Sequence, residues 1–405
     1  MRIVVVSQEY PPETAKGGIG TQAHAKAHGL AALGHEMFVI SRSPDGRPSE
    51  RLDGSVRVIR IAGWEKRMPL HTEVADWVTY SAAVGEALSV LHNLKPIDLV
   101  EFPEWAAEGY VHLINRTEWN HIPTVIQLHS PLVMFGRAIG WPDINSEFFR
   151  TGTHLESTAV RLADAIYSSS QCSLDWCAKH YGRDPAGVPV LHTGIDTGLF
   201  HPMEVEKASQ PTIVFAGKLE ANKGIFTLLE AALSLAGEVS GLRLRLLGRG
   251  TDDIVAALKE RAADAGLPAV LDLAGFVEHG RLPEELSRAH VFSAPSSYEA
   301  RPVFVNLEAM ACGLPVVTTT GSGGAEVVMH EKTGLLIPPE NAAALTDGLR
   351  RLLMDSELRH RLGRNARTYA EDVASRHLCI ARIEAFFRSV VAGTHGQHRS
   401  PGGSS

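Results

Sequence analysis

The sequence lacks the features that mark several classes of protein. Its 405 residues include only four cysteines, and no two of them have the Cys-x-x-Cys spacing of zinc or redox sites. No apolar run approaches the roughly 18 residues that a transmembrane helix requires. Acidic residues outnumber basic ones by 46 to 39, which argues against a nucleic-acid partner. We expect a cytoplasmic protein with free thiols, no integral membrane segment and no bound nucleic acid.

What the chain does have is a regular alternation of short apolar runs with longer segments of helical spacing. This alternation predicts parallel sheets with helices on both faces. The pattern restarts after a polar joint at residues 194–210, so we predict an α/β protein with two doubly wound domains. The expected strands are residues 3–6, 37–40, 56–61, 99–100, 124–128, 165–167 and 188–191 in the first half, and 212–216, 243–247, 271–273, 291–294, 316–318 and 335–337 in the second.

The segment with the most specific pattern is residues 295–326, PSSYEARPVFVNLEAMACGLPVVTTTGSGGAE. It holds two consecutive strand–turn–helix units, with Glu299 and Glu308 in the first and Gly323-Gly324 in the second. Both helices therefore begin at the same edge of a parallel sheet. Helix N-termini bind phosphate through free N–H groups, and a nearby carboxylate can accept hydrogen bonds from ribose hydroxyls. The pattern indicates a nucleotide site.

This segment resembles the signature of the retaining, nucleotide-sugar-dependent glycosyltransferases of the GT-B fold, the family that includes sucrose synthases and phosphatidylinositol mannosyltransferases. That signature has two glutamates separated by seven residues, then Ala-Met-Ala-x-Gly-x-Pro-Val, then Gly-Gly and a third acid. Residues 308–317 and 323–326 match it. Between Glu299 and Glu308 stand eight residues, however. We interpret the extra residue as a bulge that leaves Glu299 in its role; the alternative is that the first acid is displaced.

Other segments resemble the family in the same order. Lys218 and Lys223 match a Gly-Arg-Leu…Lys-Gly element whose cations hold the donor diphosphate, with Lys218 in place of the usual arginine. Gly17-Gly18 matches a loop that meets the donor's sugar-phosphate part. His129 matches a histidine at a strand end that hydrogen-bonds the donor sugar. Without the family context, these would read as solvated lysines and a structural histidine.

The resemblance implies a set of site residues, and the strand-end position of one acidic segment adds acceptor candidates. An aromatic insert at residues 131–149 also suits a sugar or ring acceptor, although a satellite core under a long loop explains it equally well. The assignments are His129 and Glu299 for catalysis; Gly17, Gly18, Lys218, Lys223, Phe304 and Val305 for the diphosphate; Glu308, Gly323 and Gly324 for ribose and sugar; and Glu101, Glu104 and Trp141 for the acceptor.

The function implied is transfer of a sugar from a nucleoside-diphosphate sugar to an acceptor hydroxyl, with retention of anomeric configuration. A UDP-sugar is the first candidate donor and a GDP-sugar the next; the acceptor would be a sugar, a small molecule or a glycoconjugate. No Asp-x-Asp motif occurs, so we expect neither a metal nor a resident cofactor. A nucleotide-sugar epimerase and a non-catalytic GT-B homologue remain alternatives, and peripheral membrane contact stays open.

The resemblance also implies the domain plan. Two Rossmann-like domains would face each other across a cleft, the acceptor-side domain at residues 1–195 and the donor domain at 196–372. The apolar stripe of Ile380, Ile383, Phe386 and Phe387 needs a surface to cover, so a helix at 373–392 should cross back to the first domain. Residues 393–405, rich in Gly, Ser, His and Pro, are expected to be disordered.

Overall fold

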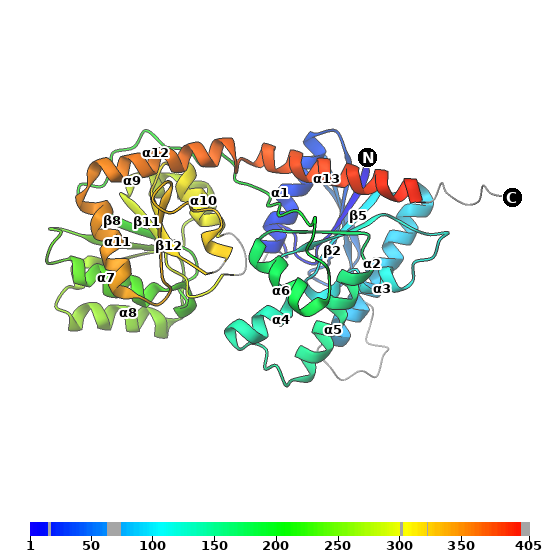
Figure 1. The fold of residues 1–405 in the computed structure, drawn as a ribbon, viewed down its shortest axis with the longest axis horizontal. Coiled ribbons are helices and arrows are strands. Elements are labelled where there is room, and N and C mark those ends of the chain that lie inside the picture. The colour runs from blue at the N-terminus through cyan, green and yellow to red at the C-terminus, as the bar shows by residue number, and fades with distance from the viewer. Residues whose placement is uncertain (15–17, 63–73, 300–302, 322, 398–405) are drawn as a thin grey trace. The chain divides into compact units, whose positions relative to one another are not determined.

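The chain forms two units, each built around its own sheet (Figure 1). The structure, a computed structural model, describes residues 1–14, 18–62, 74–299, 303–321 and 323–397. Unit 1 comprises Met1–Thr193 together with the C-terminal segment from Cys379, and unit 2 comprises Gly194–Leu378. The break between the units falls two residues before the boundary expected after residue 195.

Unit 1 contains a seven-stranded sheet in the order β3-β4-β2-β1-β5-β6-β7. All neighbouring strands are parallel except β3, which pairs antiparallel with β4 at the edge. Consecutive residues of β1 point to opposite faces, so Val4 and Val6 enter one core while Ile3 and Val5 enter the other. The strands are β1 (Arg2–Val6), β2 (Glu36–Arg42), β3 (Ser49–Asp53), β4 (Val56–Ile61), β5 (Leu99–Pro103), β6 (Thr124–Leu128) and β7 (Ala165–Ser168).

The strand predictions for this sheet missed one strand and included one that does not form. β3 was not predicted, because its sequence SERLD is polar and partly exposed at the sheet edge, without the apolar run of a buried strand. The strand expected at residues 188–191 does not form. Only one bridge, between Ser168 and Val190, occurs there. Pro189 has no N–H group to extend the ladder.

Helices cover both faces of the sheet in unit 1 and bury its two cores. One core lies under α2, α5 and α6, and the other lies under α1 and the C-terminal helix α13. The helical segments are α1 (Gly18–Ala32), α2 (Val74–Leu94), η1 (Trp105–Ala107), α3 (Tyr110–Ile114), α4 (Leu132–Met134), η2 (Phe135–Ile139), α5 (Glu147–Leu162), α6 (Gln171–Tyr181) and α13 (Arg376–Gln397).

Helix α13 completes the core of unit 1 from the far end of the chain (Figure 1). Ile380, Ile383 and Phe387 are fully buried against residues of β1, β2 and α1, and Glu384 bonds to His35 at 3.2 Å. The expectation of disorder from residue 393 was wrong for residues 393–397, because the helix continues to Gln397. The Thr394 hydroxyl donates to the carbonyl of Val390 one turn earlier.

Unit 2 contains a six-stranded, fully parallel sheet in the order β10-β9-β8-β11-β12-β13, around one large apolar core. The predicted α/β class with two parallel-sheet units is therefore confirmed. The strands are β8 (Thr212–Ala216), β9 (Arg243–Leu247), β10 (Leu271–Gly275), β11 (Val291–Ala294), β12 (Val316–Thr319) and β13 (Gly334–Ile337). The helical segments are η3 (Ala221–Lys223), α7 (Ile225–Leu235), α8 (Asp252–Asp264), η4 (Pro268–Val270), η5 (His279–Arg281), α9 (Leu282–Arg288), α10 (Phe304–Ala311), η6 (Gly323–Ala325), α11 (Ala342–Met354) and α12 (Ser356–Asp372).

The strand order reverses once in each sheet, and these reversals locate the sites. In unit 2 the chain proceeds outward from β8 in one direction and then restarts at β11 on the other side of it. In unit 1 the corresponding neighbours are β1 and β5. Ligands of open α/β sheets bind beyond the carboxyl ends of the strands at such a switch point. None of the helices in the described part of the chain has the length and hydrophobicity to cross a bilayer.

The docking of α13 predicts that unit 1 depends on the C-terminal helix for stability. Phe387→Ala should lower the free energy of unfolding of unit 1 by about 3–5 kcal/mol, because a fully buried phenylalanine is removed from a packed core. All six tryptophans lie between Trp64 and Trp176, so urea unfolding followed by tryptophan fluorescence reports on unit 1. Leu94→Ala, at a side chain 77% exposed, should change stability by less than about 0.5 kcal/mol. Equal effects of the two substitutions would contradict the docking.

Candidate functional site

The loops that follow β8, β11 and β12 carry most of the residues predicted for nucleotide binding. These three strands are neighbours in the sheet of unit 2, so their carboxyl ends lie side by side. Lys218 and Lys223 follow β8, Glu299 follows β11, and Gly323 and Gly324 follow β12 in η6. The site residues predicted in this half of the chain therefore gather at one sheet edge, at the switch point.

Backbone contacts hold the first two of these loops together. The N–H of Ser297 donates to the carbonyl of Asn222 at 2.8 Å. Gly224 has a φ of +72°, and a Cβ at this position would lie 2.0 Å from the carbonyl oxygen of Pro295. Only glycine permits this approach. The hydroxyl of Thr319 donates to the carbonyl of Ser296 at 2.6 Å, which ties the end of β12 to the same place.

Glu299 occupies the middle of this cluster despite its irregular spacing in the sequence. Its carboxylate accepts a hydrogen bond from the Lys223 ammonium at 2.6 Å, and its carbonyl accepts the N–H of Gly323 at 2.8 Å. The side chain is only 17% exposed. The extra residue before Glu308 therefore does not turn Glu299 away from the predicted site. The residues that follow directly, 300–302, lie outside the described residues.

Glu308 lies on α10, which begins with the half-buried residues Phe304 and Val305. The Glu308 side chain is 11% exposed, and Nε2 of His279 donates to it at 2.9 Å. This hydrogen bond raises the pKa of His279 above its usual value, against the opposite effect of burial. The N-cap residue of α10, Val303, supplies no side-chain acceptor, so the first N–H groups of α10 have no side-chain cap there.

Sequence reasoning missed Asn306, which links the helix α10 to the glycine loop. Asn306 is fully buried, and its amide Nδ2 donates to the carbonyl of Gly324 at 3.3 Å. The carboxamide thereby holds η6 against the first turns of α10. An uncharged polar residue inside the apolar run FVNLEAMA was the available signal.

The Lys218 side chain stands apart from this network. It is exposed, and no described residue accepts a hydrogen bond from its ammonium group. An exposed ammonium at the end of β8 provides positive charge for an anionic ligand.

In unit 1, a small cavity lies at the carboxyl ends of β1, β5 and β6, beside the first turns of α1. Its lining includes Ser7, Ile19, Lys26, Glu101 and His129. His129 directly follows β6 and is 3% exposed. The hydroxyl of Ser173 on α6 donates to the His129 carbonyl at 2.7 Å. His129 and Glu101 are thus brought together. Gly18 is the first residue of α1 and directly precedes Ile19 of the cavity lining, and Gly17 lies outside the described residues.

A buried ion pair between Lys26 and Glu101 borders this cavity. Sequence reasoning identified Glu101 but missed Lys26. The ammonium of Lys26 on α1 donates to Glu101 and, at 2.6 Å, to Gln127; the Tyr167 hydroxyl also donates to Glu101. Burial lowers the pKa of Lys26, and its contacts with Glu101 oppose that effect. The carboxylate predicted to contact an acceptor is therefore engaged inside the protein.

Three further buried carboxylates hold the loops at this sheet edge. Glu104 accepts the backbone N–H groups of His129, at 2.7 Å, and of Ser130. Glu156 accepts from Leu132 N–H at 2.8 Å and from the Tyr181 hydroxyl at 2.5 Å. Burial raises the pKa of Glu104 to about 7 and that of Glu156 to about 8.

The third of these carboxylates, Glu108, binds the loop after β1. Glu108 accepts the N–H of Gln8 at 3.1 Å, and burial raises its pKa to about 8. Glu104, predicted as an acceptor ligand, is fully buried and supports the His129 loop instead. The sequence offered a signal in residues 101–108, EFPEWAAE, where three acids stand among apolar residues.

Trp141, the remaining acceptor candidate, belongs to a group of aromatic side chains on unit 1. Its ring lies 6.4 Å from Phe135 and 6.2 Å from Phe148, and the group continues to Trp77 and Trp105. Trp141 is 55% exposed, whereas the other four are half-buried. The group thus has one exposed indole, that of Trp141, beside half-buried rings.

Comparison with known proteins connects both units to one enzyme group. Residues 199–369 match the family model described as glycosyl transferases group 1, and residues 16–199 match the one described as glycosyltransferase family 4. Glycogen synthase of Mycobacterium tuberculosis is 29% identical over 387 residues, 91% of this chain and 89% of that protein. The alpha-maltose-1-phosphate synthase of the same species is 30% identical over 360 residues, 83% of this chain and 84% of that protein.

Solved structures show the same fold over nearly the whole chain. Sucrose-phosphate synthase from Thermosynechococcus elongatus superposes with a TM-score of 0.77 at 23% identity, over 97% of this chain and 99% of the other. Anabaena Alr3699/HepE in complex with UDP and glucose superposes with a TM-score of 0.72 at 18% identity, over 96% and 100%.

The buried carboxylates make a contribution to the stability of unit 1 that decreases as the pH rises. Their pKa values in the folded protein exceed the unfolded value of 4.5, so the folded state binds more protons. The stability they contribute is complete below about pH 4.5 and is lost as the pH rises to about 8. Glu156→Gln removes one such group. Between pH 5 and 8, the slope of unfolding free energy against pH should become less negative by at most about 1.4 kcal/mol per pH unit.

Urea unfolding at several pH values, followed by tryptophan fluorescence, measures this slope. The control is Glu118→Gln, because Glu118 is exposed on the same unit and its substitution should keep the wild-type slope. An unchanged slope in Glu156→Gln would show that Glu156 does not hold an extra proton in the folded protein.

Proposed function

Since the chain belongs to the group 1 glycosyltransferase family of the GT-B fold, we propose that it transfers a sugar from a nucleoside-diphosphate sugar to an acceptor hydroxyl with retention of configuration. The observation that carries the proposal is the cluster in unit 2. Glu299 contacts both Lys223 and Gly323 at the switch point of the sheet, and the helix that carries Glu308 begins a few residues after Glu299.

The diphosphate is assigned to the cations and N–H groups of this cluster. Lys218 and Lys223 supply positive charge, and Phe304 and Val305 supply the first N–H groups of α10. The contact between Lys223 and Glu299 orients the ammonium group beside the glycine loop, Gly323 and Gly324. Lysine binds phosphate as a point charge, without the two-pronged geometry of arginine.

Glu308 is assigned to the ribose hydroxyls. Its carboxylate is mostly buried at the sheet edge and already accepts a hydrogen bond from His279, which leaves a second oxygen to accept from ribose. Glu299 is assigned to the transferred sugar. The UDP named with Anabaena Alr3699/HepE supports a UDP-sugar as the first donor to test, with a GDP-sugar next.

Transfer breaks the bond between the anomeric carbon and a diphosphate oxygen and forms a bond from that carbon to the acceptor oxygen. We assign a same-face attack, in which the departing diphosphate oxygen takes the acceptor proton. Negative charge grows on the diphosphate as the first bond breaks, so Lys218, Lys223 and the α10 N-terminus stabilise the transition state more than the ground state. The lack of an Asp-x-Asp motif supports leaving-group stabilisation without a metal.

In unit 1 we assign His129 to a hydrogen bond with the transferred sugar, and Gly17 and Gly18 to its phosphate. Glu104 then acts as a positioning residue, because it binds the backbone N–H groups of His129 and Ser130. We assign the exposed indole of Trp141 to a sugar acceptor, since aromatic rings stack on the apolar faces of sugars.

The donor can be identified by thermal shift. UDP-, GDP-, ADP- and dTDP-sugars should be compared, and the matching donor at about 100 times its Kd should stabilise the protein by roughly 2.7 kcal/mol. The product made with this donor and candidate acceptors should keep the donor's anomeric configuration by NMR, also in the presence of EDTA. Conversion of the donor sugar to an epimer without acceptor would instead favour an epimerase, and stabilisation without any turnover would favour a non-catalytic homologue.

Lys223→Ala tests the diphosphate assignment. Loss of a charge-assisted contact is worth about 1.5–3 kcal/mol, so kcat/KM should fall roughly 10- to 150-fold, with kcat reduced as well as donor affinity. Lys223→Arg keeps the charge and should recover much of the rate. Lys259→Ala, at an exposed lysine on α8, is the matched control and should retain wild-type kinetics. Wild-type kinetics in Lys223→Ala would remove Lys223 from the site.

A further inference from the structure

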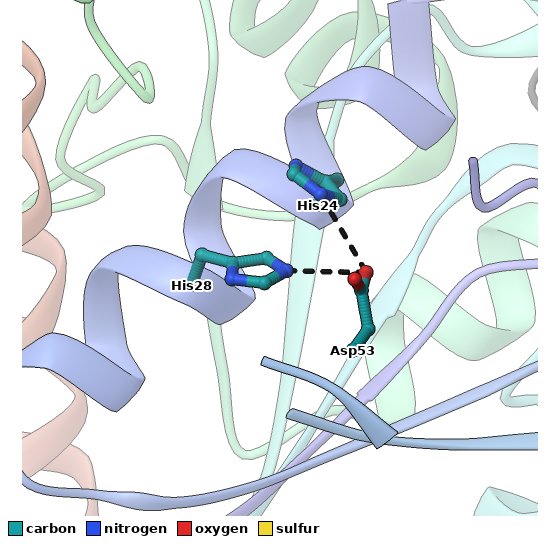
Figure 2. A group of neighbouring side chains, drawn as sticks. All are labelled: His24, His28 and Asp53. Atoms are coloured by element: carbon teal, nitrogen blue, oxygen red, sulfur yellow. Dashed lines mark hydrogen bonds and ion pairs between the residues drawn. The ribbon is translucent and has the colours of Figure 1, made fainter. Parts of the chain in front are cut away.

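Three side chains of types that commonly bind metal ions lie close together on unit 1, outside the residues assigned above. His24 and His28 stand one turn apart on α1, and Asp53 ends the edge strand β3 (Figure 2). One ligand atom from each residue lies within 4.8 Å of the other two. We propose that His24, His28 and Asp53 bind a divalent transition-metal ion, with Zn²⁺ as the ion that best fits the ligand set.

The sequence brings the two imidazoles together in a way that suits a metal. A spacing of four residues places both rings on one face of a helix, as in the zinc-binding helices of metalloproteases. Their ring centroids are 4.2 Å apart. Figure 2 shows both side chains directed from α1 toward the carboxylate. Imidazole nitrogen and carboxylate oxygen are common ligands of zinc.

The distances from the carboxylate are close to those that a bound ion requires. Oδ2 of Asp53 lies 3.2 Å from Nε2 of His28 and 3.6 Å from Nε2 of His24. A tetrahedral zinc ion with bonds of about 2.0–2.2 Å holds neighbouring ligand atoms about 3.3–3.5 Å apart. Two of the three ligand-atom separations are therefore close to those around a bound ion, and the third is within 4.8 Å.

The surroundings fix the position of the carboxylate. The Tyr10 hydroxyl donates to Oδ2 of Asp53 at 2.9 Å, and Tyr10 is itself fully buried. Gly54, in the turn after β3, has a φ of +57°, and a Cβ there would lie 3.4 Å from Cε1 of His28. The turn can therefore pack directly under α1. Arg51 lies 3.8 Å from the other oxygen, Oδ1, and leaves Oδ2 facing the histidines.

The expectation of a chain without a metal does not bear on this group, because it rested on cysteine spacing and on the Asp-x-Asp motif. The proposed ion would join α1 to the β3–β4 hairpin. It takes no part in the proposed transfer reaction, so it can be tested without a donor or an acceptor.

Competition between the full-length protein and a chromogenic chelator for Zn²⁺ tests the site. The wild type should bind one equivalent of Zn²⁺ that the double variant His24→Ala/His28→Ala binds at least about tenfold more weakly. Tyr10→Phe removes a partner of the ligating carboxylate and should weaken binding about 10- to 100-fold. His330→Ala, at an exposed histidine 3.8 Å from Glu331, is the matched control and should leave the equivalent in place.

Two measurements on the wild type keep the test independent of how the variants fold. Co²⁺ should produce the visible absorption bands of a tetrahedral site, and Zn²⁺ should shift the imidazole ¹⁵N resonances of His24 and His28. Equal Zn²⁺ affinity in the wild type and the double variant would overturn the proposal, as would unshifted resonances. Neither result changes the thermal shift that a nucleotide sugar causes. The metal site and the sugar transfer are therefore tested independently.

Discussion

Buried carboxylates that accept backbone N–H groups organise the carboxyl edge of the sheet in unit 1. Glu104 holds the loop that carries His129, Glu156 holds the start of α4, and Glu108 holds the loop after β1. Loops at a strand end have N–H groups that no ladder satisfies, and burial makes each unsatisfied group unfavourable. A carboxylate can accept several N–H groups at once, so a few acids shape the whole edge. The same burial raises the pKa values of these acids.

In unit 2, backbone contacts and small side chains hold the strand-end loops in place of buried carboxylates. Its loops bond to each other through Ser297, Thr319 and Gly323, and Asn306 supplies a buried amide that joins helix and loop. The side chains of Glu299 and Glu308 are 17% and 11% exposed, and among the described residues each pairs with a basic side chain. An edge built in this way has charged groups at its surface, which suits a charged, exchangeable ligand.

The alternation of apolar runs with helical segments predicted the α/β class, and the motif in residues 295–326 predicted the GT-B glycosyltransferase family. The comparisons confirm both. Apolar runs revealed the buried strands but not β3, because an edge strand with exposed polar residues has no such run. The resemblance singled out Lys223 and Glu299 because each lies in a matching segment, although the two residues stand 76 positions apart and meet only in the fold. Lys26 and Glu101, or His28 and Asp53, meet only through the fold, and no local pattern pairs them.

The docking of α13 has a consequence for how the protein is made. Unit 2 is continuous in the sequence, whereas one core of unit 1 stays open until Ile380, Ile383 and Phe387 leave the ribosome. At a synthesis rate of about 5–20 residues per second, the face of the sheet that will receive α13 waits roughly 10–40 seconds after Thr193 has been added. The second unit of the chain can therefore finish folding before the first, and the nascent protein must keep an apolar surface from aggregating during that interval.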